Sequence, residues 1–125
     1  MGAFDESHGR YIGTRELIGA TVFDVTLETV GSVDEAIIAR SSGQVEYVVL
    51  TCGGFLGLGE RHIPVPQEKL RWDPEMGGFI LDMTNAVLEA GPHYGDRSDA
   101  SWGNPAWVAE IDRYFDVAPS EDPGI

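Results

Sequence analysis

The glycine-rich segment from Gly53 to Gly59 is the first place where this sequence could carry chemistry. Glycine backbones can direct several amide N–H groups at a phosphate. A phosphate-binding P-loop also ends in Gly-Lys-Ser/Thr and opens a long helix, and neither feature follows here. We therefore interpret the segment as a tight turn. Its glycines are expected to serve backbone conformation, with at least one of Gly53, Gly54, Gly57 and Gly59 at positive φ.

The histidines form no recognisable catalytic or metal-binding motif. His8, His62 and His93 are far apart, and none stands in a His-x-x-x-His or His-Glu-x-x-His pattern. We interpret the strand that contains His62 as carrying a solvent-facing charged edge. The serine pair 41–42 is not enclosed in the Gly-x-Ser-x-Gly elbow of hydrolases. The sequence therefore predicts no enzyme, no cofactor and no metal.

Three acidic pairs were considered as carboxylate dyads or calcium ligands: Asp34/Glu35, Asp96/Asp99 and Asp112/Asp116. A calcium loop would need twelve residues with alternating oxygen ligands and a final glutamate, and none of the pairs lies in one. Acidic pairs in an acidic protein usually form a solvated face. We therefore expect all three pairs to lie in solvent, the last of them on the polar side of a helix.

Apolar side chains outside the strands are the candidate protein-contact residues. The candidates are Phe55, Leu56, Trp102, Trp107, Ile111, Tyr114 and Phe115. The loop pair either caps the fold or projects toward a partner. An aromatic side chain buries about 150–250 Å². The C-terminal members must therefore be covered, either by the chain's own core or by another subunit or partner, and both alternatives stay open.

About six short strands must position these residues. Alternation and turn residues predict strands at 17–24, 30–40, 44–51, 61–66, 69–72 and 78–82. Asp34 and Glu35 interrupt the alternation of the second strand, as a β-bulge would. Pro64 and Pro66 lack amide donors, so the fourth strand is expected to lie at a sheet edge or to end at a bulge. The side chains expected inside are Ile18, Val22, Val33, Ile37, Tyr47, Val49, Ile63, Val65 and Ile80.

Two helices are expected after the strands. Thr84 is a plausible N-cap for a short helix over 86–90. Asn104 and Pro105 are suited to start a second helix over 104–115, in which four of the contact candidates share one stripe. We expect an N-terminal tail over 1–15, a barrel over 16–91 and an acidic, aromatic extension over 92–125. The fold class is mainly β, a small antiparallel β-barrel with a C-terminal helical extension.

Composition limits the partners. The formal net charge is −13, from 21 acidic and 8 basic residues, so direct nucleic-acid binding is not expected. No apolar run reaches the roughly 18–20 residues of a membrane span. The first ten residues lack the pattern of a secretory signal, so a cytoplasmic location is the expectation. Cys52 is the single cysteine and is expected to be a small buried residue without a disulfide.

Residues 17–84 resemble the PRC-barrel family. The resemblance lies in an ordered set of segments: Leu17-Ile18-Gly19, Val30-Gly31-x-Val33, Tyr47-Val48-Val49, Gly53 to Gly57, Ile63 to Pro66, and Gly78 to Asp82. It implies a compact β-barrel used for protein contacts, without a shared reaction. We therefore expect a non-catalytic interaction or assembly module that forms a homodimer. Kinship with a ribosome maturation factor suggests the alternative, an accessory factor in RNA metabolism or ribosome assembly that acts through protein contacts.

Overall fold

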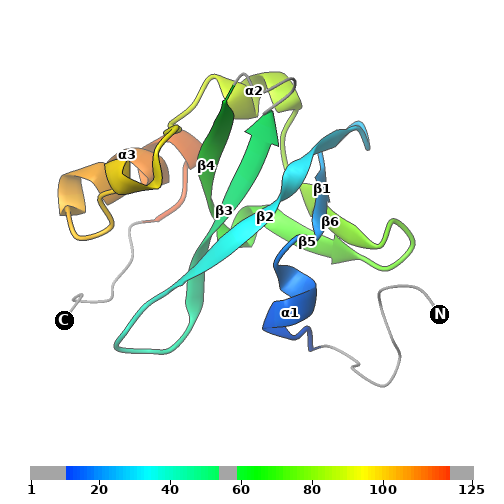
Figure 1. The fold of residues 1–125 in the computed structure, drawn as a ribbon, viewed down its shortest axis with the longest axis horizontal. Coiled ribbons are helices and arrows are strands. Elements are labelled where there is room, and N and C mark those ends of the chain that lie inside the picture. The colour runs from blue at the N-terminus through cyan, green and yellow to red at the C-terminus, as the bar shows by residue number, and fades with distance from the viewer. Residues whose placement is uncertain (1–10, 54–58, 119–125) are drawn as a thin grey trace.

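The computed structural model describes residues 11–53 and 59–118, and the strands in these ranges form one curled, six-stranded sheet (Figure 1). The strands are β1 (Thr21–Phe23), β2 (Thr29–Ile38), β3 (Val45–Gly53), β4 (Glu60–Pro66), β5 (Leu70–Asp73) and β6 (Gly78–Leu81). Their order in the sheet is β4-β3-β2-β1-β6-β5. The prediction of a mainly β, barrel-like fold with a C-terminal helix is confirmed.

Two details of the predicted barrel need correction. β1 pairs with β6 in parallel, whereas the other neighbouring strands are antiparallel, so the sheet is mixed. The sheet also does not close, because β4 and β5 lie at its two ends. The 3₁₀ turn η3 (Gln67–Lys69) connects these end strands directly and so holds the open sheet in a barrel-like curl.

The chain enters the sheet later than the sequence predicted. Residues Thr14–Leu17 form one helical turn, α1, and β1 begins at Thr21. Gly19 adopts φ +88°, a left-handed conformation that turns the chain between these elements. Ile18 precedes this turn and is 46% exposed, so its predicted burial is wrong.

The centre of the sheet follows the prediction. The register of β2 against β3 passes from Val33 to Glu35 without a partner for Asp34, which confirms the bulge. Ile37 is only partly buried. The other predicted core residues are buried: Val22, Val33, Tyr47, Val49, Ile63, Val65 and Ile80. Cys52 is also buried, as expected.

β4 is an edge strand whose outer side is partly covered. The backbone N–H and C=O of His62 exchange hydrogen bonds with Tyr94, at 2.7 and 2.9 Å. Alternate residues of a strand direct their backbone N–H and C=O groups to the same side. Pro64 and Pro66, two and four positions after His62, therefore direct their nitrogens, which carry no hydrogen, to the outer edge of β4. The prediction that at least one glycine in the segment after β3 has positive φ is confirmed, because Gly53 has φ +85°. Phe55, Leu56, Gly54 and Gly57 lie outside the described residues.

Figure 1 shows α1 and α2 at opposite ends of the fold, with α3 to one side of the sheet. Thr84 caps α2 (Asn85–Glu89) by accepting a hydrogen bond from the Val87 amide, and a short 3₁₀ turn, η4 (Arg97–Asp99), follows. Asn104 caps α3 (Pro105–Phe115), as predicted, and α3 packs beside β4. None of the described helices combines the length and apolarity that a membrane crossing requires.

Candidate functional site

The C-terminal extension packs four apolar residues on the chain's own barrel, namely Trp102, Trp107, Ile111 and Phe115. The Trp102 ring lies 5.1 Å from the Tyr47 ring and 4.9 Å from the Trp107 ring, measured between centroids. On α3, Ile111 is 1% exposed and Phe115 is 3% exposed. Of the two alternatives for covering these residues, the structure therefore shows docking within the chain.

A buried hydrogen bond fixes α3 to the sheet. The Tyr47 hydroxyl donates to Oδ1 of Asp112 at 2.5 Å, and both residues are buried. The expectation that Asp112 lies on a solvated helix face is thus wrong, because this face of α3 turns toward β3. Burial, and then the hydrogen bond and charge of Asp112, raise the pKa of Tyr47 well above its ordinary value. A cavity of about 220 Å³ adjoins this bond and is also lined by Glu46 and Glu68.

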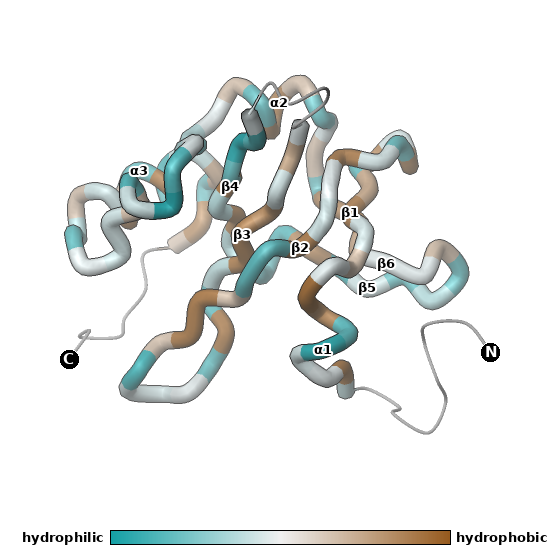
Figure 2. The backbone as a smooth tube through the Cα atoms, in the orientation of Figure 1, coloured by the Kyte–Doolittle hydropathy of each residue, from teal (hydrophilic) through white to brown (hydrophobic). Residues whose placement is uncertain are grey.

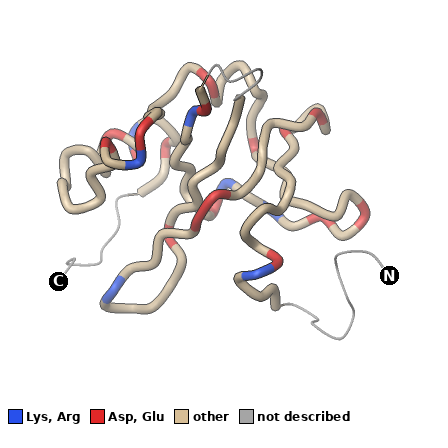
Figure 3. The backbone as a smooth tube through the Cα atoms, in the orientation of Figure 1, with Lys and Arg blue, Asp and Glu red and all other residues tan. Residues whose placement is uncertain are grey.

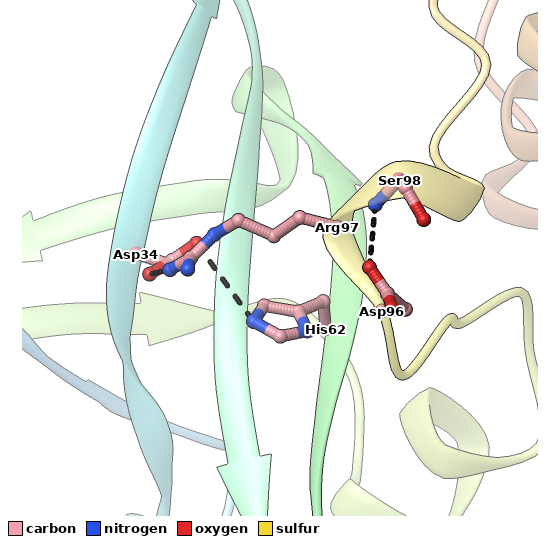
Figure 4. A network of polar contacts seen from close by, with 5 residues as sticks. All are labelled: Asp34, His62, Asp96, Arg97 and Ser98. Atoms are coloured by element: carbon pink, nitrogen blue, oxygen red, sulfur yellow. Dashed lines mark hydrogen bonds and ion pairs between the residues drawn. The ribbon is translucent and has the colours of Figure 1, made fainter.

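A second polar network joins η4 to the sheet (Figure 4). Arg97 reaches from η4 and donates from Nη2 to Oδ1 of Asp34 at 2.5 Å. The Nε2 atom of His62 lies 4.0 Å from Oδ2 of the same carboxylate. The His62 ring stacks on Tyr94, with 5.4 Å between centroids. His62 is 5% exposed, so its predicted position on a solvent-facing edge is wrong. The Asp34 side chain is 13% exposed, so the expectation that it lies in solvent is also wrong.

The bulge explains why this network was missed in the sequence. Asp34 is the extra residue of β2, and its side chain meets residues that lie 28 and 63 positions later in the chain. The ion pair with Asp34 raises the pKa of Arg97. At the start of η4, Asp96 accepts a hydrogen bond from the Ser98 amide, which lowers the pKa of Asp96. These contacts tie the segment after Tyr94 to β2 and β4, and they position α3.

Metal-ligating side chains do not gather in the described part of the chain. Across residues 11–53 and 59–118, no group of three His, Cys, Asp or Glu side chains has the arrangement of a metal site. Asp34 and His62 come within 4.0 Å of each other, but among the described residues no third metal-ligating side chain joins them.

The turn between β1 and β2 is organised by one buried carboxylate. Asp24 is 2% exposed, and its Oδ1 accepts hydrogen bonds from the Thr26 amide at 2.9 Å, the Thr26 hydroxyl at 2.5 Å and the Glu28 amide at 3.1 Å. Its Oδ2 accepts from the Asn85 amide of α2 at 3.0 Å. The Thr26 hydroxyl first, and these amides with it, lower the pKa of Asp24. The turn is therefore tied both to itself and to α2.

Two aliphatic side chains are displayed by this turn. Val25 is 48% exposed and Leu27 is 50% exposed. Figure 2 shows both hydrophobic and hydrophilic segments along the turn between β1 and β2. Leu27 has φ +70°, a conformation that is uncommon for a residue other than glycine, asparagine or aspartate. The Val25 amide donates to the Met83 carbonyl, and the Leu27 amide donates to the Asp24 carbonyl. The turn therefore holds these apolar side chains outward on a backbone whose amides at Val25 to Glu28 are all hydrogen-bonded.

Two further exposed apolar residues lie on α2 and α3. Val87 of α2 is 48% exposed, and Tyr114 of α3 is 38% exposed. The Tyr114 hydroxyl donates to the Val87 carbonyl, which holds the two residues together. Tyr114 also packs so closely on Gly91 that a Cβ atom there would lie 2.5 Å from the ring. We call Val25, Leu27, Val87 and Tyr114 the contact end.

An open cleft adjoins the contact end between α2 and α3. Its volume is about 550 Å³, and its lining includes Pro92, Glu110, Arg113 and Tyr114. Tyr114 was predicted as a contact residue on a buried stripe of the helix, and its 38% exposure shows that its burial was predicted wrongly. Val25, Leu27 and Val87 were not predicted. The Asp24-x-Thr26 spacing, which is typical of an Asx turn, was the available signal for an ordered turn.

The described strands form a small, curled β-domain with a displayed turn between β1 and β2. The sequence model of the PRC-barrel domain matches residues 9–82, more than half of the 125 residues. The chain belongs to the PRC-barrel family. No curated protein matches it.

Proposed function

We propose that this PRC-barrel protein is a non-catalytic interaction or assembly module that binds a protein partner through the contact end. The observation that carries the proposal is the display of half-exposed Val25 and Leu27 on a turn that buried Asp24 holds rigid. Membership of a family of small domains supports an interaction role. The proposal assigns no residue to catalysis.

The rigidity of the turn favours binding. A surface that is ordered before it meets its partner loses less conformational entropy on association. The backbone amides of Val25, Thr26, Leu27 and Glu28 all have hydrogen-bond partners. Completing the burial of Val25 and Leu27 would contribute roughly 1.5–3 kcal/mol, because full burial of each would contribute about 1.5–3 kcal/mol and about half of each side chain is already buried.

Self-association remains a prediction, although the reason that first suggested it no longer applies. The sequence suggested a homodimer because the C-terminal aromatics needed covering. In the structure Ile111 and Phe115 are covered by the same chain, so a second copy is not needed for that purpose. A dimer would have to use the contact end or another exposed surface. We therefore consider a different protein the first candidate for the binding partner, and a second copy of this chain the next.

The proposal is tested by affinity purification of the tagged protein from its native cells, followed by identification of bound proteins. Wild type is compared with Leu27→Asn and with Ile38→Thr, a control at the β2–β3 hairpin where Ile38 is 53% exposed. We expect a partner in stoichiometric amount that is lost with Leu27→Asn and kept with Ile38→Thr. Ribosomal or RNA-processing partners would select the RNA-metabolism alternative. The absence of any partner that depends on Leu27 would contradict the proposal.

A further inference from the structure

A cavity of about 220 Å³ lies where β3, η3 and α3 meet. These elements contribute Glu46, Glu68 and Asp112 to its lining. Of the described residues, no Lys, Arg or His lines it. The residues of the contact end do not line it either. The cavity is therefore a separate feature of the fold, and the charged side chains that line it are all acidic.

One of the three carboxylates is buried without a cation beside it. Asp112 is 5% exposed, and the hydrogen bond from the Tyr47 hydroxyl occupies its Oδ1 atom alone. None of the ion pairs formed within residues 11–53 and 59–118 includes Asp112. A carboxylate held this far from water is costly unless it is paired. A cation in the cavity would supply the missing partner of Asp112.

The cavity suits an organic cation better than a metal ion. Glu46, Glu68 and Asp112 are described residues, and they do not form a group that could hold a metal ion. Val45 and Pro66 make part of the wall apolar, which favours methylene groups over hydrated ions. At about 30 Å³ for each water, the cavity would hold roughly seven waters or a flexible chain of about as many non-hydrogen atoms.

We propose that this cavity binds a small aliphatic diamine, with one ammonium group on Asp112 and the other beside Glu46 and Glu68. The order of exposure supports this arrangement, because Asp112 is buried, Glu46 is partly exposed and Glu68 is exposed. Carboxylates thus lie both deep in the cavity and toward its opening, and methylene groups would span the apolar wall between them. The inference does not depend on the contact end or on the proposed function.

The net charge of −13 attracts cations to the protein as a whole, so the cavity needs a matched control. Figure 3 shows acidic residues spread over both strands and helices. Glu110 is exposed on α3 and does not line the cavity. Glu110→Gln therefore removes the same charge as Glu68→Gln and leaves the lining of the cavity unchanged.

The experiment titrates the full chain with cadaverine and follows the heat of binding by calorimetry. We expect saturable binding at one site. Asp112→Asn should weaken it about tenfold or more, because a buried charged hydrogen-bond partner is lost. Glu68→Gln should weaken it about threefold, since this carboxylate is exposed and screened. Glu110→Gln should leave it unchanged. Glu68→Gln is on the surface, so its result stands even where Asp112→Asn lowers stability.

Three probes define the ligand class. Pentylamine has one ammonium group and should bind more weakly than cadaverine, and Mg²⁺ should not compete with cadaverine at equal concentration. Nα-acetyl-lysine amide presents the ammonium group of a partner's lysine and should also bind more weakly. Tighter binding of the lysine probe would assign the cavity to a protein partner and overturn the inference. The absence of saturable cadaverine binding, equal affinity for pentylamine, displacement by Mg²⁺, or an equal loss with Glu110→Gln would each overturn it as well.

Discussion

Replacing Tyr47 by Phe tests how α3 is held on the barrel. The change removes the hydroxyl that donates to Asp112 at 2.5 Å and keeps the ring that contacts Trp102. Apolar burial is therefore almost unchanged. In the variant, Asp112 stays 5% exposed, but its Oδ1 atom no longer has the Tyr47 hydroxyl as a hydrogen-bond donor.

The expected loss of unfolding free energy is about 2–3 kcal/mol. Hydrogen bonds to charged groups contribute about 1.5–3 kcal/mol, and a buried acceptor without a donor adds a desolvation penalty. The cavity beside the bond limits the loss, because water can approach Asp112 from its side. Replacing both partners by apolar groups of similar shape is close to neutral. Tyr47→Phe combined with Asp112→Leu should thus recover much of the loss.

Urea unfolding at neutral pH, followed by Trp fluorescence, measures these differences. Trp102 and Trp107 lie in the docked extension, so their emission reports on the region under test. The four proteins of the double-mutant cycle give a coupling free energy, which we expect to be about 1–3 kcal/mol. A Tyr47→Phe protein within 0.5 kcal/mol of wild type, or a double variant less stable than either single variant, would refute this account of α3 docking.

Four further results are expected. Gly31→Ala should cost about 3 kcal/mol or more in urea unfolding, because its Cβ would lie 2.2 Å from a backbone carbonyl of β3; a smaller loss would contradict the close β2–β3 approach. Burial raises the pKa of Cys52 to about 11 and that of Tyr94 to about 12, so the folded state favours the protonated forms; stability should hold below about pH 9 and fall as the pH rises toward 12, and a flat profile across that window would count against their burial. A chain that stops at Gly91 should lose about 4 kcal/mol or more with the packing of α3, and an unchanged melting temperature would make the extension dispensable. Leu27→Asn should be as stable as wild type or more stable, and a loss above 1 kcal/mol in thermal unfolding would show that the side chain supports the fold.

Local patterns in the sequence predicted most of the strands and both longer helices. Alternation is a local property, so it located β2 to β6 and the bulge at Asp34. Side-chain chemistry at Thr84 and Asn104 located the starts of α2 and α3. The parallel pairing of β1 with β6 was not predictable in this way, because it depends on which distant strands become neighbours.

The errors share a physical cause, which is contact between residues far apart in the chain. Asp112 was predicted to be a surface carboxylate, but it accepts a hydrogen bond from the Tyr47 hydroxyl, 65 positions earlier in the chain. His62 was predicted to be exposed, but Tyr94 pairs with its backbone and stacks on its ring. The contact end was missed because Leu27 is exposed for a conformational reason, its positive φ within a turn that Asp24 organises.

The central claim is that the contact end is the binding surface. The most direct test is an NMR titration of the ¹⁵N-labelled protein with its identified partner. We expect the largest changes in amide chemical shift at Val25 to Glu28 and at Ala86 to Glu89. Changes confined to the β2–β3 hairpin around Ile38, or no changes at saturating partner concentration, would contradict the claim.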